Sequence, residues 1–131
     1  MRTLFPLLLV PVLASCSAAY ADPQSATTSS DERLERALAG RVAGPPQQCL
    51  PVTRTQQSTV YRGAILYRAG DTIYRNDLNG CPELNWNTVP VIQVRGATIC
   101  AGEIVQLSDR GVGGPVGACS FGPFVPYTRV R

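Results

Sequence analysis

The chain has 131 residues, all 12 of its basic side chains are arginine, and it contains five cysteines but neither lysine nor histidine. Without histidine there is no Ser-His-Asp triad, no Cys-His dyad and no histidine-ligated metal site. Without lysine there is no Schiff base and no P-loop lysine. The serines and threonines have no recognisable base, so the sequence by itself indicates no biochemical activity.

Residues 1–21 have the pattern of a signal peptide. Arg2 supplies the positive start, and Leu4 to Ala14 form an apolar stretch interrupted by two prolines. That stretch is too short for a spanning helix, which needs about 20 apolar residues. No later stretch approaches this length, so we expect no transmembrane helix in the mature protein.

Two interpretations of the cleavage site remain open. Ala19 to Ala21 form an A-x-A site, which would give a soluble mature protein. Leu13 to Cys16 instead resemble the bacterial lipobox, in which Cys16 is lipidated and becomes the first mature residue. Both interpretations place the protein in the bacterial cell envelope, either in the periplasm or on the periplasmic face of the outer membrane. In the second interpretation, the lipid on Cys16 is the only membrane attachment.

The mature charge is weak. Loss of Arg2 leaves 11 arginines and 9 acidic residues, a net charge of +2. Nucleic-acid binding calls for a strong basic stripe, so we expect no nucleic-acid partner. The expected partner is an unidentified ligand or protein of the envelope.

Residues 22–47 are predicted to form a tether and a short helix. The polar, non-periodic stretch 22–30 is typical of a linker. Ser29 and Glu32 have the spacing of a capping box, and Gly40 is suited to the position after the helix end. The apolar face of this helix would consist of Leu34, Ala37 and Leu38. A helix of about ten residues is unstable alone in water, so it must dock on the domain or fray.

Residues 48–131 show a period of two and predict a mainly β domain. The expected fold is a small antiparallel sheet or barrel of about five strands, linked by disulfides. The strands are predicted at 50–55, 59–68, 72–76, 89–94 and 103–107. Residues 69–71 form the turn of a hairpin. Tyr61, Ile65 and Tyr67 are expected to face the core, although Leu66 interrupts this alternation.

Three further segments complete the domain. Residues 84–87 have no clear pattern. Residues 111–117 contain four glycines and a proline, which indicates a flexible loop rather than a phosphate-binding turn, because no helix start or lysine follows. Residues 121–127 are too apolar for a free tail and are expected to pack across the domain.

Four cysteines lie within the predicted β domain, at positions 49, 81, 100 and 119. In an oxidising compartment this even number predicts two disulfides, with three possible connectivities. We favour the nested pairing, Cys49–Cys119 with Cys81–Cys100, because it joins the two ends of the domain. A four-cysteine metal site and a redox-active pair are disfavoured, because no C-x2-4-C knuckle is present. No metal or cofactor is expected.

Short motifs across residues 48–128 resemble a family of small exported bacterial proteins of unknown function that share a four-cysteine framework. The residues that carry the resemblance are Cys49-Leu50, Thr53-Arg54-Thr55, Tyr74-Arg75-Asn76, Leu78, Cys81-Pro82, Leu84, Ile99-Cys100, Gly102-Glu103, Cys119, Gly122, Phe124, Pro126 and Tyr127. Members of that family are lipoproteins or periplasmic proteins. The resemblance therefore implies export, disulfides and one domain, and it supplies no catalytic residue.

Arginines and tyrosines alternate along the best predicted strands and suggest a binding surface. Such a surface could bind an oligosaccharide, an acidic polymer or single-stranded nucleic acid, and export disfavours the last. In the competing interpretation, the arginines face solvent and the tyrosines form the core. Trp86 lies between two asparagines in a turn-rich segment and is expected to be partly exposed. A core or rim position is favoured over a platform for a sugar. The candidate contact residues are Tyr61, Arg62, Tyr67, Arg68, Tyr74 and Trp86.

Two functions remain as hypotheses. The first is a non-enzymatic envelope protein that acts as a binding or accessory module. The alternative is a periplasmic hydrolase that uses carboxylates alone, drawn from Asp71, Asp77 and Glu103. Such an enzyme needs two carboxylates a few ångströms apart, and nothing in the sequence spacing marks such a pair.

Overall fold

The computed structural model describes residues 23–131, so the predictions for residues 1–21, including lipidation of Cys16, lie outside the described part. Within it the protein is mainly β, with one helix and three antiparallel sheets that do not close into a barrel. This confirms the predicted class, a small disulfide-linked β domain with one N-terminal helix. The described part contains ten strands rather than about five, because the strand predicted at 59–68 divides into two. Four further strands, at 41–43, 98–100, 115–120 and 124–129, lie where no strand was predicted.

The largest sheet has five strands in the order β1-β10-β5-β4-β3. The strands are β1 (Arg41–Ala43), β10 (Phe124–Arg129), β5 (Thr72–Asp77), β4 (Ala64–Ala69) and β3 (Gln57–Tyr61). The C-terminal strand β10 therefore lies between β1 and β5, which confirms that the last apolar segment packs across the domain. β1 precedes residue 48, so the sheet begins upstream of the predicted start of the β domain.

The other two sheets are smaller. β2 (Cys49–Pro51) pairs with β7 (Thr98–Cys100), and the third sheet has the order β6-β8-β9. Its strands are β6 (Thr88–Ile92), β8 (Ile104–Asp109) and β9 (Pro115–Ser120). A short 3-10 turn, η1 (Val52–Arg54), follows β2, so the strand predicted at 50–55 ends early.

The segment predicted as the best single strand is a hairpin. β3 and β4 are joined by the two-residue turn Arg62-Gly63, in which Gly63 has a φ of 73° that side chains other than glycine rarely adopt. Tyr61 pairs directly with Ala64 across the turn. Tyr61 and Ile65 therefore lie on opposite faces of the sheet, and the prediction that both face the core is wrong. The neighbouring hairpin, β4–β5, was predicted and is confirmed.

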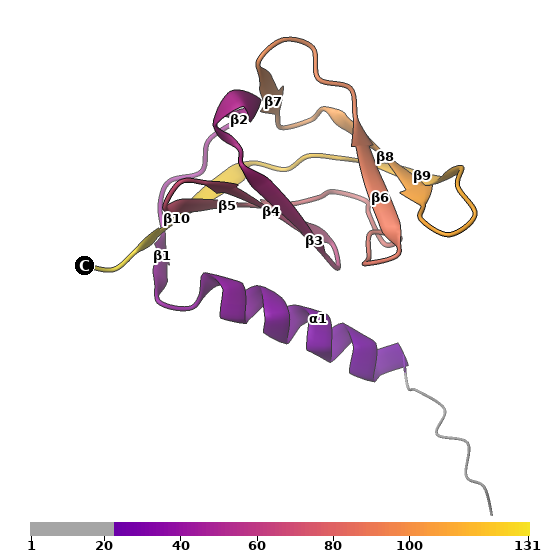
Figure 1. Ribbon diagram of the computed structural model, residues 1–131, viewed down its shortest axis with the longest axis horizontal. Helices are drawn as coiled ribbons and strands as arrows, with labels where there is room; N and C mark the ends of the chain where they lie inside the picture. Colours follow the sequence, from indigo (N-terminus) through magenta and orange to yellow (C-terminus); the bar gives the residue numbers. More distant parts are fainter. Residues whose placement is uncertain (1–22) are drawn as a thin grey trace, which may run out of the picture.

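Both faces of the five-stranded sheet are covered (Figure 1). On one face, Ile65 and Tyr67 belong to the main core together with Phe121 and Phe124. On the other face, α1 (Pro23–Leu38) lies across β3 and β4. A second cluster forms there from Leu34, Leu38, Ala64, Leu66 and Ile73. Leu66 interrupts the alternation because the helix shields its face of β4 from water.

The helix is longer than predicted. It begins at Pro23, so residues 23–30, predicted as a linker, are helical, and Ser29 lies inside the helix rather than at its cap. Proline is favoured in a first helical turn, where a backbone N–H has no partner within the helix. The predicted end is confirmed, with Gly40 at a φ of 71° just beyond the last turn. No helix in the described part of the chain is long and apolar enough to cross a membrane.

The glycine-rich segment is partly a strand. β9 begins at Pro115 and pairs with β8, although residues 111–117 were predicted as a flexible loop. Gly113 and Gly114 have positive φ and form the turn between the two strands. The Asp109 carboxylate Oδ1 accepts hydrogen bonds from the backbone N–H of Gly111 at 2.8 Å and of Val112 at 2.9 Å, which orders the start of this turn.

The four cysteines of the β domain form two disulfides, as predicted, but the nested pairing is wrong. The bonds are Cys49–Cys100 and Cys81–Cys119. Cys49 and Cys100 face each other in the β2–β7 ladder, and both Cys81 and Cys119 are buried in the main core. Strand pairing brings Cys49 and Cys100 together, and the isolated bridge between Asn79 and Ser120 lies beside the Cys81–Cys119 bond.

Candidate functional site

Three of the six predicted contact residues, Tyr61, Arg62 and Trp86, line one hollow of about 650 Å³. This size lies within the range of small-ligand sites. The hollow lies between α1, the end of β3 and the turn at residues 85–87, and we call it the Trp86 cleft. Its lining residues are Ser29, Ser30, Arg33, Thr59, Val60, Tyr61, Arg62, Asn85, Trp86 and Asn87.

Trp86 lies at the tip of a turn that is fixed at both ends. The Thr88 backbone N–H donates to the Asn85 carbonyl at 3.2 Å, and the Asn87 N–H donates to the Asn85 side-chain oxygen at 2.8 Å. Leu84, just before the turn, is fully buried, and Thr88, just after it, is 5% exposed. The indole is 77% exposed. A core position for Trp86 is therefore wrong, because the turn anchors its neighbours and leaves the ring in solvent.

Two asparagines flank the indole and have hydrogen-bonding capacity to spare. The Asn85 side-chain nitrogen donates to the Glu83 carbonyl at 2.7 Å, and the Asn87 side-chain nitrogen donates to the Asp109 carboxylate at 3.2 Å. Each amide nitrogen has a second N–H, and the Asn87 side-chain oxygen accepts no hydrogen bond from the described residues. These groups are held in place beside the exposed ring and can bind a polar ligand.

The opposite wall of the cleft belongs to α1. The Arg62 backbone N–H donates to Ser30 Oγ at 3.1 Å, which ties the β3–β4 turn to the helix. Leu34 and Leu38 pack this helix onto the sheet. Arg33 lies one turn beyond Ser30 and thus on the same side of the helix. Arg33 forms no ion pair with any side chain that the structure describes.

The lining of the Trp86 cleft is positively charged. It contains two guanidinium groups, those of Arg33 and Arg62, and no carboxylate. Both arginines are exposed residues. The hydroxyl groups of Ser29, Ser30, Thr59 and Tyr61 complete a polar rim around the single exposed indole. This arrangement favours a polar, negatively charged ligand with an apolar face.

The other three predicted contact residues lie elsewhere. Tyr67 is 5% exposed and packs against Phe121 and Phe124, with ring centroids at 6.4 and 6.0 Å. Burial raises the pKa of its phenol well above the ordinary value. Tyr74 is half-buried against the same core. Neither tyrosine is part of the cleft, and Tyr67 is too deeply buried for a surface contact. Arg68 is exposed and lines a smaller hollow of about 100 Å³ with Tyr61.

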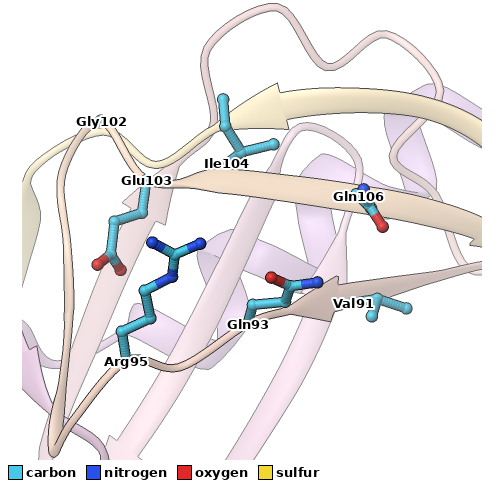
Figure 2. A pocket seen from close by; sticks show the side chains of 7 residues that line it. All are labelled: Val91, Gln93, Arg95, Gly102, Glu103, Ile104 and Gln106. Carbon is cyan, nitrogen blue, oxygen red and sulfur yellow. The ribbon is translucent and has the colours of Figure 1, made fainter.

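A second, shallower hollow of about 330 Å³ lies over β6 and the turn that enters β8. Figure 2 shows the side chains of Arg95 and Glu103 directed toward each other across it, with Gln93 beside them. The Glu103 carboxylate accepts a hydrogen bond from the Cys100 backbone N–H at 2.9 Å. Glu103 therefore holds the turn between β7 and β8, next to a disulfide-bonded cysteine.

The carboxylates proposed for a hydrolase are dispersed. Asp77 forms an ion pair with Arg75, with Nε and Oδ1 at 3.0 Å. Asp71 lies in the β4–β5 turn, and Glu103 lies just before β8. The Trp86 cleft contains no acid, and the second hollow contains only Glu103. No observation in the described part of the chain favours carboxylate-based hydrolysis over binding.

Among the described residues, no group of three or more histidine, cysteine, aspartate or glutamate side chains could hold a metal ion. Comparisons of the chain with protein families, with curated proteins and with solved structures find no match. The fold and the cleft therefore define the protein only as a small disulfide-linked β domain with a basic, tryptophan-bearing cleft.

The sequence alone identified three of the ten residues that line this cleft. Ser29, Ser30 and Arg33 were placed in a linker and a short helix, and nothing local indicates that this helix docks beside residues 85–87. Asn85 and Asn87 carried a usable signal. A tryptophan between two turn-forming asparagines is expected to be partly exposed, and the indole is 77% exposed.

Proposed function

We propose that this protein is a non-enzymatic saccharide-binding module of the bacterial cell envelope, and that the Trp86 cleft is its binding site. The observation that carries the proposal is the exposed indole of Trp86, which shares one cleft with Tyr61 and Arg62. A sugar ring has an apolar face that packs on an aromatic ring and hydroxyl groups that bind amides and hydroxyls around it. The cleft offers both kinds of contact. The turn that carries Trp86 is already held by hydrogen bonds, so less entropy is lost on binding.

The envelope location is part of the same proposal. Residues 1–21 have the signal-peptide pattern, and two disulfides suit an oxidising compartment. The resemblance to small exported bacterial proteins supports the same location. The lipid anchor at Cys16 would hold the binding module at the membrane surface.

The mass of the protein isolated from a bacterial envelope tests the location and the anchor. We expect acyl chains on Cys16 as the first residue and a gain of four hydrogen atoms on reduction, because two disulfides open. A mass that starts at Asp22 without acyl chains would remove the lipid anchor and leave export intact. An uncleaved, fully reduced chain would contradict export.

Titration of intrinsic fluorescence tests saccharide binding, because Trp86 is the only tryptophan in the chain. The probes are hexamers of N-acetylglucosamine, of glucose and of galacturonic acid. We expect at least one of them to change the emission of Trp86 in a saturable way. In calorimetry, Trp86→Ala should weaken binding by about tenfold or more, as for a central aromatic contact, whereas its unfolding midpoint should match that of the wild type.

Val112→Ala is the matched control, because Val112 is 91% exposed and lies outside the cleft. This variant should bind each probe as the wild type does. If no hexamer changes the fluorescence at millimolar concentration, or if Trp86→Ala binds normally, the proposed function is wrong.

A further inference from the structure

The positive charge of the Trp86 cleft indicates what kind of ligand it can bind. Its lining contains two arginines and no acidic residue, although the chain as a whole has 9 acidic residues against 12 basic ones. A site for a neutral sugar needs no such excess, because amides and hydroxyls satisfy the hydroxyls of the sugar. The excess therefore points to a negative charge on the ligand itself.

The two guanidinium groups belong to elements that are tied together. Arg33 is carried by α1, and Arg62 is carried by the β3–β4 turn. The hydrogen bond from the Arg62 backbone N–H to Ser30 Oγ, at 3.1 Å, joins these two elements beside the cleft. Ser30 and Arg33 are three residues apart and share one side of the helix. Both arginines line the cleft, and the hydrogen bond fixes their backbones relative to each other.

We propose that the ligand of the Trp86 cleft is an acidic saccharide, in which the Trp86 indole packs on a sugar ring while Arg33 and Arg62 bind its carboxylate or sulfate group. This inference rests on the proposed function. Arginine suits the role because its planar fork can bind two oxygens of one carboxylate or sulfate. The indole and the polar rim favour a sugar over an acidic peptide, since a peptide of acidic residues offers no apolar ring face for the tryptophan.

A pair of probes that differ in charge and by one methyl group per sugar tests this inference on the full mature protein. They are the hexamer of galacturonic acid and the same hexamer with every carboxylate methyl-esterified. We expect the acid to bind about tenfold or more tightly than the ester at low salt, with the difference shrinking as sodium chloride screens the charges. Arg33→Gln and Arg62→Gln should each weaken binding of the acid by about fivefold and leave binding of the ester unchanged.

Arg54→Gln is the matched control, because Arg54 is an exposed arginine of η1 outside the cleft. It should keep the affinity and the salt dependence of the wild type. Poly-glutamate of similar length tests whether charge alone suffices, and we expect it to bind much more weakly than the acidic hexamer. Circular dichroism and the thermal midpoint of each variant show whether it is folded.

The outcomes separate the two proposals. Equal binding of the acid and the ester, both lost in Trp86→Ala, would overturn the acidic ligand and leave saccharide binding intact. Binding of poly-glutamate as tight as that of the acid would overturn the saccharide and favour an acidic peptide. If the double variant Arg33→Gln/Arg62→Gln still prefers the acid, the two arginines do not bind the charged group. If neither hexamer binds, the proposed function fails and the acidic ligand with it.

Discussion

The double variant Cys81→Ala/Cys119→Ala should lose about 4 kcal/mol of unfolding free energy, because the bond closes a loop of 38 residues and its loss restores that entropy to the unfolded chain. Both sulfurs also lie in the main core, with Cys81 at 8% and Cys119 at 6% exposure. A small domain has about 5–15 kcal/mol in total, so the variant should be near its unfolding threshold. Urea denaturation followed by circular dichroism measures the loss.

The pairing itself is checked by tryptic peptides under non-reducing conditions, since arginines separate all four cysteines of the β domain. Peptide 42–54 should be linked to 96–110, and peptide 76–95 should be linked to 111–129. Linkage of 42–54 to 111–129 would restore the nested pairing and contradict the structure. Val112→Ala, at a 91% exposed position that leaves both disulfides in place, is the control and should unfold as the wild type does.

Replacement of Asn76 by alanine should destabilise the protein by about 4 kcal/mol, because it leaves two buried backbone groups without partners. The Asn76 side chain is fully buried. Its nitrogen donates to the Gly122 carbonyl at 2.7 Å, and its oxygen accepts from the Gly122 N–H at 3.1 Å. Residue 122 has no room for a side chain, since a Cβ there would run into the Asp77 carbonyl oxygen. Asn76 thus links β5 to the segment just before β10. The thermal unfolding midpoint of Asn76→Ala measures the loss of stability.

The variant Asn76→Asp tests the same hydrogen bonds by the pH dependence of its stability. A carboxylate accepts the Gly122 N–H but has no proton to donate to the Gly122 carbonyl, and burial disfavours its charge, so its pKa in the folded state is raised. The variant should be least destabilised below about pH 4, the unfolded value for aspartate, and should lose stability as pH rises through the folded value. Asn79→Asp, an exposed asparagine three residues on, is the control. If the loss of stability relative to the wild type is the same at pH 4 and at pH 7, the two buried hydrogen bonds of Asn76 are contradicted.

The Leu66 and Tyr61 positions show where sequence periodicity fails. Alternation identifies the two faces of a strand, but it does not reveal that a helix covers the second face, as α1 covers Leu66. The Arg62-Gly63 turn lies inside a run of strand-forming residues and reverses the facing of Tyr61. The positive φ of Gly63 is the physical signal of this turn, and a glycine in a strand run is the sequence hint for it.

The candidate site was also predicted only in part. Tyr61, Arg62 and Trp86 were predicted as contacts from residue type, and the structure places them in one cleft. Tyr67 was also predicted, but its ring packs against Phe121 and Phe124. Tyrosine suits a core as well as a surface, so residue type alone could not separate these two tyrosines. Their positions on the two faces of the sheet decide the outcome.

The amino-acid sequence by itself determined the class of this protein. Its period of two, its four cysteines in the β region and its helix end at Gly40 are local properties, which depend on neighbouring residues and on composition. The tertiary structure alone decided which cysteines pair, which face of β4 the helix covers and which residues meet at Trp86. These are contacts between residues distant in the chain, such as Cys81 with Cys119 or Ser30 with Arg62, and they depend on which elements become neighbours when the chain folds.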